Sequence, residues 1–181
     1  MLDQIRAGKN LPVPDYWRGT VEDVDKALDG VRRGKVVSLR KSAGGRSLRA
    51  VIYGPQAPLR RTANLNSAFG ASLPRAYVDK TQRRPSLMLV GGAHGSEMEG
   101  IVGLVNLISV MESGYDLLGR SWKNLQALAE GVRLTILPCL NPDGRARVRL
   151  KSYVGETAET YRYWMQGTRQ DGTLYSWPAV K

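Results

Sequence analysis

The sequence has a single cysteine, Cys139, and a single histidine, His94. One cysteine cannot form an intrachain disulfide, so no disulfide framework supports the fold, which is consistent with a reducing compartment. We expect Cys139 to be a small residue of the hydrophobic core. One histidine excludes any metal site that takes two histidines from this chain.

Long hydrophobic runs are absent as well. The first residues, Met1 to Arg6, lack the apolar stretch of a secretory signal peptide. The richest later stretch, Ile101 to Met111, is too short to cross a bilayer. We therefore expect a cytoplasmic protein without a membrane partner.

Acidic residues are scarce relative to basic ones. Against 27 Lys and Arg there are 16 Asp and Glu, which gives a formal net charge of +11. Such a charge attracts polyanions. The basic residues are scattered from Arg6 to Lys181, however, and they form no recognition-helix stripe, zinc-finger spacing or aromatic RNA-binding signature. A solvated arginine-rich surface is therefore favoured over a nucleic-acid partner, and the oligomeric state is left open.

The amino-terminal part predicts a helix followed by a β-hairpin. Thr20 and Asp23 have the spacing of a capping box for a helix through about Val31. Two strands are expected at 36–41 and 47–53, joined by a glycine-rich turn. Residues 55–84 show no sustained periodicity, which indicates a functional loop or an insertion.

The central part predicts an α/β fold. Two short apolar runs, Ser86 to Val90 and Val132 to Leu137, are typical of buried strands. Between them, Ser96 and Glu99 have capping-box spacing before a helix that is apolar nearly all round, and a second helix is expected over 121–130. The order strand, helix, helix, strand indicates a mixed, mainly parallel sheet with flanking helices. The length favours one domain.

Two polar turns follow the two apolar strands. His94 and Glu97 lie three residues apart just after the first strand, where ligands collect in open α/β sheets. Their imidazole and carboxylate could face one metal ion. Alternatively, His94 bonds a backbone group and Glu97 merely favours a helix N-terminus. The second turn, Asn141-Pro142-Asp143-Gly144, is by itself a type I turn, but at the same sheet edge it could line a pocket.

Together these segments resemble the amino-terminal half of the carboxypeptidase A-type zinc metallocarboxypeptidases. The resemblance rests on Gly92-Ala93-His94-Gly95-Ser96-Glu97, an apolar helix, a strand and Asn141-Pro142-Asp143-Gly144, in that order. The hairpin segment from Gly45 to Gly54 is similar to the family's first two strands, and the likeness extends from Val36 to Trp164. It implies an α/β/α hydrolase domain that removes C-terminal residues from peptides. We divide the chain into a helical lead-in, 1–34, and a partial catalytic domain, 35–181.

The resemblance also implies roles for individual residues. His94 and Glu97 would be the first two ligands of Zn²⁺, which would polarise the scissile carbonyl and activate water. Asn141, Asp143 and Gly144 would shape the pocket floor without touching the metal. Arg162 and Arg169 are candidates to bind the carboxylate of a peptide C-terminus, because a guanidinium can grip it through two hydrogen bonds. They could equally be solvated surface arginines.

Two parts of the family's machinery have no counterpart in this sequence. The third ligand, a histidine, and the general-base glutamate would lie downstream of the matched segments, so no catalytic residue is identified in the chain. We expect a truncated domain, weakly active or inactive in isolation, that arose as a cut reading frame, a fragment or a degenerate homologue. The alternatives are a zinc-dependent N-acyl amino acid deacylase of the succinylglutamate desuccinylase or aspartoacylase type, and a non-catalytic basic binding module.

Overall fold

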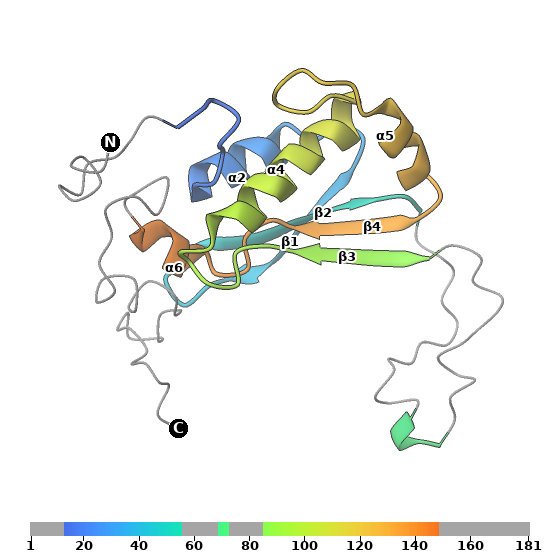
Figure 1. The fold of residues 1–181 in the computed structure, drawn as a ribbon. Helices are drawn as coiled ribbons and strands as arrows, with labels where there is room; N and C mark the ends of the chain where they lie inside the picture. Colours follow the sequence, from blue (N-terminus) through green and yellow to red (C-terminus); the bar gives the residue numbers. More distant parts are fainter. Residues whose placement is uncertain (1–12, 56–68, 73–84, 149–181) are drawn as a thin grey trace.

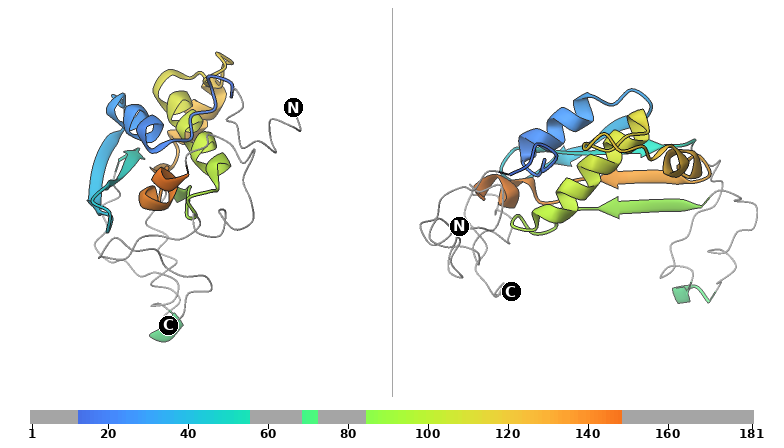
Figure 2. Two further views of the ribbon diagram at one scale, coloured as in Figure 1. Left: turned by 90° about the vertical axis from the view of Figure 1, so that its left-hand side faces the viewer. Right: turned by 45° about the horizontal axis from the view of Figure 1, so that its top comes forward.

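The computed structural model describes residues 13–55, 69–72 and 85–148 (Figure 1). Its four-stranded sheet has the order β1-β2-β4-β3. Helices α2, α4 and α5 lie on one side of this sheet, and α6 lies at one end (Figures 1 and 2). In chain order the elements are α2 (Val21–Asp29), β1 (Lys35–Lys41), β2 (Ser47–Tyr53), β3 (Ser86–Val90), α4 (Met98–Ser113), α5 (Lys123–Ala129), β4 (Arg133–Leu137) and α6 (Pro142–Arg147).

The predicted helix and hairpin at the amino-terminal end are confirmed. Thr20 caps α2 by accepting a 3.1 Å hydrogen bond from the Asp23 backbone N–H, and the Asp23 carboxylate accepts a 3.0 Å bond from the Thr20 N–H. Strands β1 and β2 pair antiparallel. Gly45 in the turn between them has a φ of +82°, a conformation that glycine adopts without strain.

The predicted mixed α/β sheet is also confirmed. Strands β3 and β4 are parallel, as the strand-helix-helix-strand order requires. Strand β4 pairs antiparallel with β2, so two of the three pairings among the described strands are antiparallel. The parallel component in this part of the chain is therefore the β3–β4 pair.

The prediction that both apolar strands are buried is right for β4 and wrong for β3. Leu134, Ile136 and Leu137 of β4 are buried, because β4 lies between β2 and β3 under α4. In β3, Met88 is 58% exposed and Val90 is 46% exposed. Strand β3 lies at the edge of the described sheet and the helices cover one face of it, so an apolar run alone did not indicate burial on both faces.

The hydrophobic core lies between the sheet and the helices. Its central members are buried side chains from four elements and one loop: Val24, Leu28, Val51, Tyr53, Ile101, Val105, Leu134, Ile136 and Cys139. The expected core position of Cys139 is thus confirmed, and α2 contributes to the same core as α4. None of the helices in the described ranges is long and apolar enough to span a bilayer. The loop or insertion predicted at 55–84 falls mostly outside these ranges.

Candidate metal centre

His94 and Glu97 come together in the loop between β3 and α4. Nδ1 of His94 lies 2.9 Å from Oε1 of Glu97. The two side chains are 42% and 48% exposed, so both are accessible to a ligand from solvent. The structure therefore brings the two predicted metal donors into direct contact at the carboxyl end of a strand, as the sequence led us to expect.

The backbone of this loop is bonded to the chain that follows β4. Leu140 N–H donates to Gly91 O and Asn141 N–H donates to Gly92 O, both at 2.9 Å. Gly92 has a φ of +58°, which allows the chain to turn sharply after β3. The two polar turns thus lie side by side beyond the ends of the parallel strands β3 and β4.

The capping box predicted from Ser96 and Glu99 is wrong. Helix α4 begins at Met98, so Glu97 occupies the N-cap position and makes no side-chain capping bond. Glu99 is then the second helical residue, one position short of the third position that a capping box requires. Ser96 is buried at 1% exposure, and its Oγ has no hydrogen-bond partner among the described residues.

The Asn141-Pro142-Asp143-Gly144 turn is the first turn of α6. Asn141 is the N-cap residue, and its Oδ1 accepts a 2.9 Å hydrogen bond from the Gly144 N–H. Pro142 occupies the start of the helix, where its missing N–H is not needed. The four residues whose types alone are typical of a type I turn are therefore the start of a helix.

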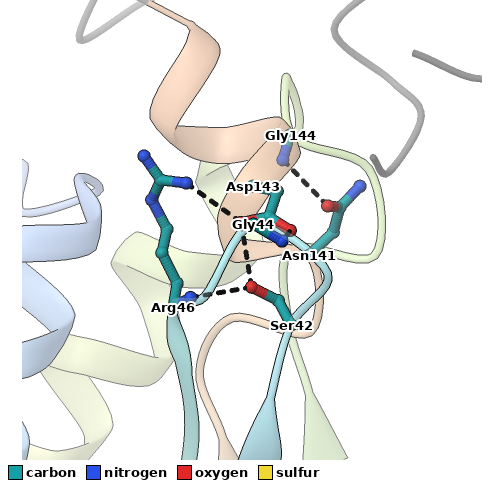
Figure 3. Close-up of polar contacts among 6 residues, drawn as sticks. All are labelled: Ser42, Gly44, Arg46, Asn141, Asp143 and Gly144. Atoms are coloured by element: carbon teal, nitrogen blue, oxygen red, sulfur yellow. Dashed lines mark hydrogen bonds and ion pairs between the residues drawn. The ribbon is translucent and has the colours of Figure 1, made fainter. Parts of the chain in front are cut away.

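Asp143 is a buried carboxylate that binds the β1–β2 hairpin (Figure 3). It accepts hydrogen bonds from Ser42 Oγ at 2.9 Å, from Gly44 N–H at 2.9 Å and from Arg46 Nη1 at 3.0 Å. Burial alone raises the pKa of Asp143, but the bonds from Gly44, Ser42 and Arg46 outweigh it and hold the pKa below its ordinary value. Asp143 is therefore ionised and tightly held at neutral pH.

Gly95, between the two candidate ligands, lies against α6. A β-carbon on Gly95 would be 2.1 Å from the carbonyl carbon of Gly144 and 2.5 Å from the nitrogen of Arg145. Only a residue without a β-carbon allows this approach of two backbones. The loop that carries His94 and Glu97 is thus packed directly on the turn that carries Asp143.

Arg145 was not predicted from the sequence, yet it is 2% exposed. Its Nε donates to the Gly19 carbonyl, just before α2, and its Nη1 donates to the Val148 carbonyl at 3.2 Å. The bond to Gly19 ties α6 to the segment before α2, and the bond to Val148 closes the end of α6. No local spacing signals such a partner, because the Gly19 carbonyl is 126 residues away.

Comparison with known families identifies this arrangement. The sequence profile of the family described as zinc carboxypeptidase matches residues 30–173. The chain belongs to the zinc carboxypeptidase family. Within that family, the fold is also found in carboxypeptidase A from Helicoverpa armigera, with 17% identity and a TM-score of 0.52 over 93% of this chain and 34% of that one.

A second similar structure is thrombin activatable fibrinolysis inhibitor. It is 10% identical, with a TM-score of 0.51 over 85% of this chain and 31% of that chain. This zinc carboxypeptidase chain therefore spans about a third of the length of both solved structures. A search of the curated proteins gives no match.

His94 and Glu97 can be compared with the geometry of a zinc site. Nitrogen and oxygen donors about 2.0–2.1 Å from a tetrahedral zinc lie about 3.3 Å from each other. The 2.9 Å separation of His94 Nδ1 and Glu97 Oε1 is close to that spacing, and both side chains are accessible. These two residues therefore fit a zinc ion as partial ligands. No cluster of three His, Cys, Asp or Glu able to hold a metal occurs within 13–55, 69–72 and 85–148.

The remaining site predictions have different outcomes. Arg162 and Arg169, the candidates for binding a substrate carboxylate, lie outside the described residues. Asn141, Asp143 and Gly144 do lie beside the candidate ligands, and their role in shaping a pocket stays a prediction. Sequence reasoning missed Ser42, Gly44 and Arg46, which donate the three hydrogen bonds to the Asp143 carboxylate.

Proposed function

We propose that this chain carries the amino-terminal part of a zinc-dependent metallocarboxypeptidase, with His94 and Glu97 as two of the zinc ligands. The observation that carries the proposal is the convergence of Nδ1 and Oε1 at 2.9 Å, at the carboxyl end of β3, in a chain of the zinc carboxypeptidase family. The substrate class we propose is a peptide with a free C-terminal carboxylate. Arg162 and Arg169 are proposed to bind that carboxylate.

His94 must act as a neutral donor to hold a metal. In the contact with Glu97, a hydrogen bond between Nδ1 and Oε1 occupies the place that a metal would take. Metal binding at Nδ1 would therefore require this bond to break and the ring proton to lie on Nε2. A bound zinc supplies a Lewis acid and lowers the pKa of its water ligand.

The sequence has one histidine, so a site with two histidines needs the second from another polypeptide segment. The same holds for the general base, for which no candidate was identified in this chain. We therefore propose that the 181-residue chain binds zinc weakly. Its carboxypeptidase activity on peptides should be low or absent.

The test is a Zn²⁺ titration of the ¹⁵N-labelled chain, followed through the ring nitrogens of His94. Because His94 is the only histidine, its ring signals need no assignment. We expect saturable shifts that are lost in Glu97→Gln. Isothermal titration calorimetry, which needs no histidine signal, should show that zinc binding is also lost in His94→Ala. Glu99→Gln is the matched control, since it removes the same charge two residues away and should bind zinc like the wild type.

Zinc binding that persists in His94→Ala would disprove the ligand assignment. Peptide turnover by the zinc-loaded wild-type chain, abolished by His94→Ala, would disprove the expected inactivity. Hydrolysis of N-acyl amino acids in place of peptides would instead favour the deacylase alternative.

A further inference from the structure

Asp143 connects two segments that are far apart in the sequence. Its side chain is 5% exposed and is held by three donors, whereas the Arg46 side chain that binds it is 44% exposed. The carboxylate is thus the buried centre of this cluster, and the hairpin closes over it (Figure 3). A β-carbon on Gly44 would lie 2.5 Å from Asp143 Oδ1, so the hairpin turn approaches as closely as its backbone allows.

The same turn is the surface on which the candidate ligand loop rests. Gly95 packs against the backbone of Gly144 and Arg145, and Asn141 N–H donates to Gly92 O at 2.9 Å. Gly144 directly follows Asp143, and Gly95 directly follows His94. A displacement of the Asp143 turn would therefore move the backbone between the two candidate ligands.

We propose that Asp143 is a positioning residue for the His94–Glu97 pair, acting by fixing the Asn141–Gly144 turn to the β1–β2 hairpin. The metal-binding part of this inference rests on the proposed function, whereas the positioning part concerns the metal-free loop. Residues that orient metal ligands from outside the ligand shell affect metal affinity about 10–100-fold. A hairpin residue such as Ser42 or Arg46 should thus influence a site that it does not touch.

The other anchor of α6 does not replace this contact. Arg145 ties the helix to Gly19, on the side of α2, whereas Asp143 ties its first turn to the hairpin. Loss of the Asp143 carboxylate leaves the Arg145 bonds in place. The expected effect is therefore local loosening of the first turn of α6 and of the loop packed on it.

The experiment compares Asp143→Asn with Asp116→Asn in the full chain. Asp116 is a matched control, because it too is a buried carboxylate with three hydrogen bonds, from Leu118 N–H, Arg120 N–H and Trp122 Nε1. It lies in the loop after α4, at the other end of that helix from His94. Two milder variants, Ser42→Ala and Arg46→Ala, test the same contact from the hairpin side if Asp143→Asn does not fold.

Three quantities are measured at neutral pH: amide exchange at Asn141, the ring ¹⁵N shifts of His94 without metal, and Zn²⁺ affinity. We expect Asp143→Asn to speed exchange at Asn141 at least about 10-fold and to shift the His94 ring signals. We also expect it to weaken zinc binding about 10-fold. Arg46→Lys, which keeps the charge, should restore most of what Arg46→Ala loses, and Asp116→Asn should change none of the three.

Unchanged exchange and ring signals in folded Asp143→Asn, or equal changes in Asp116→Asn, would overturn the positioning role. The failure of the proposed function has a different signature, namely a wild-type chain whose His94 does not respond to Zn²⁺. In that case the two metal-free measurements still decide whether Asp143 positions the pair.

Discussion

The hydroxyl of Tyr53, at the end of β2, donates a 2.9 Å hydrogen bond to Oε1 of Glu112, in the last turn of α4. The same carboxylate accepts backbone N–H bonds from Arg32 at 2.8 Å, Arg33 at 2.9 Å and Gly34 at 3.3 Å. Burial raises the pKa of Tyr53, and the bond to Glu112 raises it further. Glu112 thus joins α4, β2 and the segment before β1 from one point.

We predict that Glu112→Gln lowers the free energy of unfolding by about 1.5–3 kcal/mol, because the amide leaves donors without an anionic acceptor. Tyr53→Phe removes one donor and leaves the three backbone bonds, so it should cost about 0.5–1.5 kcal/mol. Urea unfolding of both variants measures the difference. Equal losses would show that the backbone bonds to Glu112 contribute little.

A second prediction concerns Gly95. An alanine there would place its β-carbon 2.1 Å from the Gly144 carbonyl carbon, so one of the two backbones must move. We expect Gly95→Ala to cost at least about 1–3 kcal/mol of stability and to disturb the ring signals of His94. Gly103→Ala is the matched control: its β-carbon would meet nothing within 4 Å, and alanine favours a helix by about 0.5–1 kcal/mol. A Gly95→Ala chain as stable as wild type would contradict the close packing.

Features set by neighbouring residues could be predicted from the sequence. The capping box of Thr20 and Asp23, the hairpin and the contact between His94 and Glu97 each depend on residues within a few positions of one another. Glycine spacing and strand patterning carry enough information for such features. The parallel pairing of β3 and β4 followed from the element order.

Features set by distant residues could not be predicted. Asp143 and Ser42 are 101 residues apart, and Arg145 and Gly19 are 126 apart, so no spacing rule connects them. The exposure of Met88 and Val90 depends on what covers the outer face and edge of β3, which an apolar run does not record. The Ser96–Glu99 capping box failed for a smaller reason, because a shift of one residue in a helix start changes every capping position.

The third prediction is a loss of stability in acid through Asp143 and Glu112. Burial opposes ionisation of Glu112, but hydrogen bonds from Arg33, Arg32, Tyr53 and Gly34 lower its pKa, as the hairpin donors lower that of Asp143. A carboxyl whose pKa is lower in the folded state stabilises the fold above its unfolded pKa. That stabilisation is lost as pH falls through the folded pKa.

We therefore expect the free energy of unfolding to fall as pH drops below the ordinary carboxyl pKa values of 3.8 and 4.5. The fall should be shallower in Asp143→Asn and in Glu112→Gln, since each lacks one of the two groups. Urea unfolding at several values between pH 7 and pH 3 measures it. A control variant, Glu130→Gln, alters a carboxylate that is 70% exposed and should follow the wild type. Parallel curves for all four chains would contradict the assignment.

The fourth prediction uses Cys139, which is buried between β4 and the Asn141 turn. Burial raises the pKa of its thiol to about 11, so at pH 8 only about one molecule in a thousand carries the reactive thiolate. We expect a thiol reagent to label the native chain far more slowly than the urea-unfolded chain, and to label one site in each. Because Cys139 lies two residues before Asn141, Gly95→Ala and Asp143→Asn should speed labelling of the folded protein, whereas Asp116→Asn should not. Rapid labelling of the wild-type chain in the absence of urea would show that this turn opens without any of these changes, and would remove the support for a rigid ligand loop.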